Sequence, residues 1–225
     1  MPIRRRLTNK TMDSQYTQEI VRLFRQYYFV LKPLLTVVEA TYEEFPVQIH
    51  NEIRSFTDRI ALCYGRGAGE NEIAEHLRDA SSHINRAILD CYKFLNVYSH
   101  DSIKQFEFET RYVDLTLVSD GDFYREYLNL KSKAVRAVKL AKDSENERKN
   151  DGIDATYELY QAANNAYTEL RNYIDENMPK IDLAGKRYRK IRRMNYAGTA
   201  LSWVISGVIG AVIAIVIGWF INVKA

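Results

Sequence analysis

Apolar residues recur every three or four positions along most of the chain before residue 182, a spacing that predicts amphipathic helices. The longest series lies between residues 70 and 98, and its members are Ile73, Leu77, Ala80, Ile84, Ala87, Cys91, Phe94 and Tyr98. Shorter series predict helices over 14–31, 34–42, 46–64, 123–141 and 154–178. A strand competes with a helix only over 106–118. The pattern predicts an all-α bundle of long antiparallel helices.

Glycine and proline mark the expected breaks between these helices. The glycine-rich turn Gly65–Gly69 separates the 46–64 helix from the 70–98 helix, so we expect these two to form an antiparallel hairpin. Pro33 and Pro179 are each expected to break or kink a helix, because proline lacks an N–H and its ring clashes with the preceding turn. The charged stretch 142–152 reads as a helix end and loop.

The last apolar segment, residues 197–223, contains 27 residues without a charge. A helix of that length extends about 40 Å, which exceeds the hydrocarbon core of a bilayer at about 30 Å. We therefore expect a C-terminal transmembrane anchor. The expected organisation is a basic N-terminal tail (1–13), a cytosolic helical domain (14–181), a basic juxtamembrane helix (182–196) and the transmembrane helix (197–223).

Charged and aromatic residues beside this segment predict its orientation. Basic residues are retained on the cytoplasmic side of a span, and six of them precede the segment: Lys186, Arg187, Arg189, Lys190, Arg192 and Arg193. Trp203 and Trp219 lie near its two ends, where indole rings suit the membrane–water boundary. We expect a single-pass protein of the bacterial inner membrane, with the N-terminal domain in the cytoplasm and the basic cluster against lipid headgroups.

Small residues follow one another at a spacing of four within the segment: Gly198, Ser202, Ser206, Gly210, Ala214 and Gly218. Small side chains let two membrane helices approach closely, so this register predicts a homo-oligomer. Each step of four rotates the register by about 40°. A crossed dimer through the middle of the register and a ring of helices both satisfy this geometry.

Composition and spacing favour a protein without catalytic chemistry. The net charge of +3 lacks the basic excess typical of nucleic-acid-binding proteins. The two cysteines, Cys63 and Cys91, fall in apolar patterns and are expected to be buried thiols. His76 and His83 are seven residues apart, too far to share a metal ion without another ligand between them. We expect neither a cofactor nor a metal.

One motif supports an alternative. Residues 78–83 read Arg-Asp-Ala-Ser-Ser-His, which resembles the R-x4-H signature of HEPN ribonucleases, helical proteins that dimerise and pair two such motifs. The resemblance covers six residues. It implies that Arg78 stabilises an RNA phosphate and that His83 assists attack by the 2′-hydroxyl.

The sequence predicts a tail-anchored membrane protein that self-associates through its transmembrane helix and carries a cytosolic domain for sensing or binding. Its expected partners are the bilayer, other copies of the chain and a cytosolic protein or small-molecule trigger. A membrane-perturbing or pore-forming effector of bacterial antiphage defence is the concrete form of this prediction. The alternatives are the membrane-tethered HEPN-like ribonuclease, which alone would bind nucleic acid, and a simple membrane adaptor.

Overall fold

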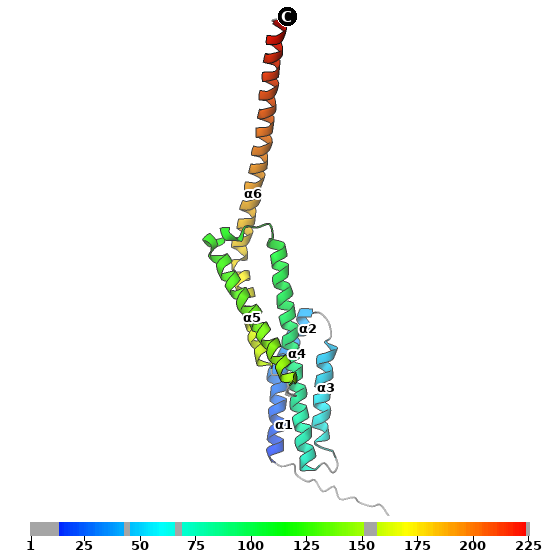
Figure 1. The fold of residues 1–225 in the computed structure, drawn as a ribbon. Helices are drawn as coiled ribbons and strands as arrows, with labels where there is room; N and C mark the ends of the chain where they lie inside the picture. Colours follow the sequence, from blue (N-terminus) through cyan, green and yellow to red (C-terminus); the bar gives the residue numbers. More distant parts are fainter. Residues whose placement is uncertain (1–13, 43–45, 66–68, 151–156, 224–225) are drawn as a thin grey trace, which may run out of the picture. The chain divides into compact units, whose positions relative to one another are not determined.

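The computed structural model describes residues 14–42, 46–65, 69–150 and 157–223, and every regular element in these ranges is helical (Figure 1). The elements are α1 (Ser14–Gln26), the π-helical turn η1 (Tyr27–Leu31), α2 (Lys32–Tyr42), α3 (Val47–Leu62), α4 (Glu70–Thr110), the 3-10 turn η2 (Leu115–Gly121), α5 (Asp122–Asn150) and α6 (Glu158–Val223). The all-α prediction is confirmed for this part of the chain. The predicted tail 1–13 lies outside it.

The chain divides into two compact units. The first comprises Met1–Gln105 and Leu128–Asn172, and the second comprises Phe106–Tyr127 and Tyr173–Ala225. Helices α4, α5 and α6 therefore each contribute residues to both units.

Helix α4 is the central element of the first unit. Its core residues follow the predicted spacing of three and four, and Ala80, Ile84, Ala87 and Cys91 are all fully buried. The buried face is wider than the predicted stripe, because Ile88, Leu89, Tyr92 and Leu95 are also buried. A helix buried on more than one side must pack against several neighbours.

Helices α3 and α4 form the predicted antiparallel hairpin. Polar pairs between them run in opposite directions along the chain: Gln48 with Asp90, Glu52 with His83 and Arg59 with Asp79. Phe56 of α3 is buried and meets two aromatic rings from the N-terminal helices, with ring centroids 5.6 Å from Phe24 and 6.2 Å from Tyr27.

Pro33 does not end the N-terminal helix. The helix changes to π spacing over Tyr27–Leu31, and the Lys32 N–H bonds the Tyr27 carbonyl five residues earlier. A proline at position 33 would clash with the carbonyl of Phe29 in a regular α-helix, and the wider π turn lies where that clash would occur. The expected disruption is thus a local change of helical spacing.

Helices α4, α5 and α6 extend beyond their predicted ends. Helix α4 continues to Thr110 and η2 follows, so the competing strand interpretation of 106–118 is wrong. The predicted interruption at Pro179 is also wrong, since this proline lies inside α6. Pro179 leaves the Asp175 carbonyl without its N–H partner, and both residues are exposed, so water can replace that bond.

The second unit contains a short aromatic stack. Phe123 is buried, and its ring lies 5.4 Å from that of Tyr173 and 6.1 Å from that of Tyr127. The Tyr127 hydroxyl donates to Glu107 at 2.7 Å, which satisfies the polar end of a buried ring.

No membrane-spanning helix is found where the structure describes side chains, over residues 15–42, 46–65, 69–147 and 157–190. The predicted transmembrane segment, its small-residue register, Arg192, Arg193, Trp203 and Trp219 lie outside these ranges. For 191–223 the structure gives the helical backbone of α6.

The end of η2, just before α5, supplies a test of the second unit. Ser119, Asp120 and Gly121 have φ angles of 50°, 54° and 90° in succession. Gly121→Ala should lower the free energy of unfolding by about 1 kcal/mol, because an L side chain is disfavoured at positive φ. Asp120→Gly, at the same turn, should leave that free energy unchanged or raise it. Denaturant titration of the full chain measures both, and equal losses would contradict this account.

The buried thiols supply a second test. Burial raises the pKa of Cys63 and raises that of Cys91 to about 12, so the reactive thiolate is scarce in the folded protein. Both cysteines should resist iodoacetamide at pH 8 in the native chain and react readily in urea, as measured by mass spectrometry. Raising the pH to 9.5 should speed alkylation in urea while leaving native Cys91 protected. Rapid native alkylation of Cys91 would contradict its placement in the core.

Candidate functional site

The structure places Arg78 and His83 on different sides of α4. Five residues along an α-helix correspond to a rotation of about 140° beyond a full turn. Arg78 is exposed and lines a groove with Tyr16 and Glu19 of α1, whereas His83 contacts Glu52 of α3. The two side chains of the R-x4-H motif are therefore not brought together within the chain.

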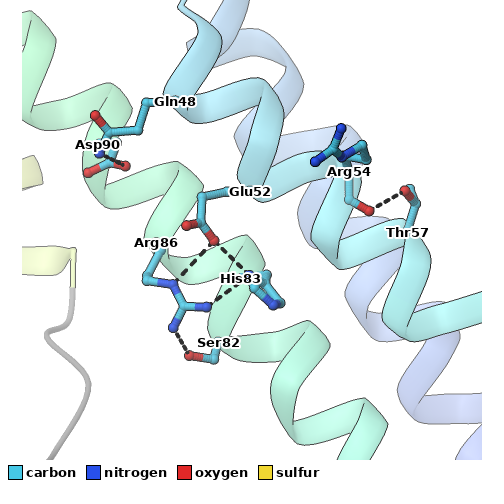
Figure 2. Close-up of polar contacts among 8 residues, drawn as sticks. All are labelled: Gln48, Glu52, Arg54, Thr57, Ser82, His83, Arg86 and Asp90. Carbon is cyan, nitrogen blue, oxygen red and sulfur yellow. Dashed lines mark hydrogen bonds and ion pairs between the residues drawn. The ribbon is translucent and has the colours of Figure 1, made fainter. Parts of the chain in front are cut away.

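His83 belongs to a polar cluster between α3 and α4, drawn in Figure 2. The Glu52 carboxylate lies between two basic side chains, 2.7 Å from His83 Nδ1 and 3.2 Å from Arg86 Nε. The Arg86 guanidinium also lies 2.8 Å from His83 Nδ1 and donates to the Ser82 hydroxyl at 2.6 Å. One carboxylate thus joins the two helices at this level.

A second polar pair lies further along the same interface. The Gln48 amide donates to Asp90 at 2.9 Å (Figure 2). Burial raises the pKa of Asp90, while the nearby Lys93 ammonium and the Gln48 hydrogen bond act in the opposite direction. These contacts satisfy polar groups at the edge of the core, which is a structural role.

The described residues show no group of three or more His, Cys, Asp or Glu side chains placed to hold a metal ion. Asp79, which follows Arg78, pairs instead with Arg59 of α3 at 3.2 Å. The α3–α4 interface therefore offers paired charges and no cluster of free ligands.

A pocket of about 370 Å³ lies in the first unit, between α4, α5 and α6. Its lining combines apolar and polar side chains: Lys93, Asn96, Val97, His100, Val135, Val138, Lys142, Tyr160 and Tyr167. Tyr160 and Tyr167 are buried, whereas Val97 and Val135 are exposed. The buried tyrosines of α6 thus form the inner wall, and the valines of α4 and α5 form the rim.

Hydrogen bonds fix most of the polar groups around this pocket. The Lys93 ammonium and the Tyr160 hydroxyl both donate to the Glu145 carboxylate at 2.7 Å, and His100 Nδ1 lies 3.2 Å from the Tyr167 hydroxyl. Burial raises the pKa of Tyr160 and of Tyr167, so both phenols are neutral at physiological pH.

Asn96 is the exception. Its residue is 5% exposed, and its Nδ2 donates to the Tyr160 carbonyl at 2.9 Å. Its Oδ1 is buried and accepts no hydrogen bond from the residues that the structure describes. Leaving a buried acceptor unsatisfied costs about 1–3 kcal/mol, which the rest of the fold must offset.

Four residues of the predicted membrane-surface cluster fall within the described part of α6. Lys186, Arg187, Arg189 and Lys190 are all exposed. No ion pair between them and another described residue is present, so their charges face solvent. This arrangement suits contact with anionic headgroups.

Sequence reasoning did not find the pocket. Asn96, Tyr160 and Lys142 lie on three different helices, and their approach depends on tertiary packing. A polar residue inside the buried part of a long amphipathic helix is the one local signal, and Asn96 carries it.

A search of family profiles, curated proteins and solved structures found no significant match to this chain.

The Glu52 bridge gives a test of the α3–α4 hairpin. Glu52→Gln removes the charge that His83 and Arg86 share, and should lower the free energy of unfolding by about 1 kcal/mol. Glu75→Gln, at an exposed position on α4, should change it by less than about 0.5 kcal/mol. Denaturant titration of both variants provides the comparison. An equal effect would show that the bridge contributes no stability.

Proposed function

We propose that this chain is a single-pass membrane protein whose helical domain binds a trigger or partner and whose apolar helix self-associates. The observation that carries the proposal is the uncharged run of 27 residues, 197–223, which continues α6 without a break in helical backbone. Such a run is long enough to cross a bilayer.

Two features of α6 support the proposal. The exposed basic residues at 186–190 precede the apolar run, as expected for a helix that enters the membrane from the cytoplasm. The same helix carries Tyr160 and Tyr167, which line the pocket of the first unit. Ligand binding would therefore act directly on the helix that carries the membrane segment.

The proposal has two forms. In the first, the small-residue register assembles several copies into a membrane-perturbing or pore-forming effector, as in bacterial antiphage defence. In the second, the helix only tethers a partner to the bilayer. Release of a soluble dye from vesicles containing the protein separates the two forms, because only the first form permeabilises the bilayer.

The ribonuclease alternative has weaker support. Its two motif residues line different surfaces of α4, and His83 is held by Glu52 and Arg86. The resemblance implies a site completed by the motif of a second copy, and His83 would first have to leave Glu52 and Arg86. We therefore favour the membrane-binding proposal.

Membrane attachment and self-association give the test. The full chain should remain with the membrane after an alkaline carbonate wash and should migrate as an oligomer in mild detergent. Gly210→Ile should reduce the oligomeric fraction at least about fivefold, because a bulky side chain separates the helices. The matched control, Val212→Ile, changes a residue outside the small-residue register and should leave assembly intact.

Either of two results would overturn the proposal. Release of the wild-type chain by carbonate would remove the membrane anchor. An equal effect of Gly210→Ile and Val212→Ile would remove the small-residue register as the interface.

A further inference from the structure

We infer that the outward side of the N-terminal helix, over residues 21–40, binds the headgroup region of an anionic bilayer. These residues belong to the first unit, and the inference concerns that unit alone. The contact goes beyond the proposed function, because it needs neither the apolar run at 197–223 nor its self-association.

Exposed residues form two neighbouring rows along α1, η1 and α2, each with a spacing of four. We call the two rows the outer face, and its members are Val21, Arg25, Phe29, Pro33, Val37, Phe24, Tyr28, Lys32, Thr36 and Ala40. The same helix buries Leu23, Leu31 and Val38 on its other side. The helix is thus apolar on two sides, and the described part of the chain covers only one of them.

The outer face exposes a large amount of aromatic surface. Tyr28 and Phe29 are 57% and 70% exposed, and their rings pack edge to face with centroids 5.1 Å apart. Val21, Phe24 and Val37 are each between 44% and 50% exposed. Contiguous exposed apolar surface of this kind marks a contact with a partner or a membrane. Tyrosine suits the membrane–water boundary, because its ring is apolar and its hydroxyl is polar.

The charges of the outer face are all positive. Arg25 and Lys32 are its only charged residues, and neither forms an ion pair with another described residue. The Lys32 ammonium lies 5.1 Å from the centre of the Tyr28 ring, so charge and aromatic surface are adjacent. The sequence before α1 has one carboxylate, Asp13, and four cations: Arg4, Arg5, Arg6 and Lys10. Cations beside exposed aromatic rings are typical of helices that lie in the surface of an anionic bilayer.

These charges also decide between a bilayer and two other occupants. A second copy of the chain on this face would bring cations against cations, and the outer face has no carboxylate to pair with them. An acidic protein would satisfy the charges, but it would need a hollow shaped to fit a single convex helix. A fluid headgroup layer supplies negative charge and adapts to a convex apolar surface.

The test holds the full chain in nanodiscs of phosphatidylcholine, so that the apolar run is surrounded by neutral lipid. Vesicles are then added, made either of phosphatidylcholine alone or with about 30% phosphatidylglycerol, which is anionic. Hydroxyl-radical oxidation of Tyr28 and Phe29, followed by mass spectrometry, measures whether the outer face is covered. Phe108, which is 59% exposed on α4, is the control in the same sample.

Anionic vesicles should slow oxidation of Tyr28 and Phe29 at least about threefold and leave Phe108 unchanged. Neutral vesicles should protect only weakly. Raising the salt to about 0.5 M should restore oxidation, because it screens the attraction between the cations and the headgroups. This comparison uses the unaltered chain, so it does not depend on whether a variant folds.

A matched pair of variants assigns the effect to the outer face. Arg25→Glu reverses one of its charges and should weaken co-flotation of the nanodisc-held chain with anionic vesicles at least about fivefold. Arg136→Glu makes the same change of net charge at an exposed position on α5 and should leave co-flotation unchanged.

Four results would overturn the inference: no protection by anionic vesicles, equal protection by neutral vesicles, equal protection of Phe108, or equal losses in Arg25→Glu and Arg136→Glu. Protection by polyglutamate with none by vesicles would also overturn it, and would indicate an acidic protein instead.

A carbonate wash of cell membranes reports the anchor separately. Release of the chain by carbonate, with protection of Phe29 retained, would remove the proposed function alone. Retention in carbonate without protection would remove this inference alone.

Discussion

Burial of α4 on several sides is the constraint on which the rest of the first unit depends. The helix meets α1 through Asn85, α3 through His83, α5 through Lys93 and α6 through Asn96. Small side chains at Ala80 and Ala87 are fully buried, which lets neighbouring helices approach the α4 backbone. A single helix thus determines where the flanking helices lie.

The same constraint explains which features were predictable from the sequence. The apolar series of 70–98 is long and regular, so the helix and the centre of its core face followed from periodicity, and the glycine-rich turn before it predicted the hairpin with α3. The ends were less predictable. Residues 106–110 fit a helix and a strand about equally well by pattern, so the end of α4 at Thr110 did not follow from periodicity. Neither Pro33 nor Pro179 ends its helix. The π turn at Tyr27–Leu31 accommodates Pro33, and water can bind the carbonyl that Pro179 leaves without a partner.

The sites divide in the same way. The R-x4-H spacing joins two residues that are close in sequence, but five residues along the predicted helix already turn their side chains about 140° apart. The pocket presents the opposite case. Its residues come from three helices and share no motif, so the sequence gives no indication of them beyond a polar Asn96 within an apolar face. The structure contributes the contact partners that turn this residue into a candidate site.

The proposed function joins the pocket to the membrane through one continuous element. Helix α6 supplies two pocket-lining tyrosines and then an exposed basic stretch at 186–190, before the apolar segment. The pocket-lining tyrosines and the apolar segment therefore lie on one helix, without a linker between them. The polar cluster of α3 and α4, by contrast, holds the hairpin together and contributes no residue to the pocket.

The π turn at Tyr27–Leu31 has a consequence for how this protein tolerates length changes. The wider turn absorbs one extra residue and keeps the phase of the helix, so that Leu23 before the turn and Val38 after it are both buried. Phe29 lies in the same turn and is 70% exposed, so its side chain contributes little to the core. Deleting one residue here would return the turn to α spacing and keep Leu23 and Val38 on the buried side, but it would bring the Pro33 ring against the carbonyl four residues earlier. The cost of a deletion here would therefore come from the proline ring, while the two flanking helices would keep their buried faces.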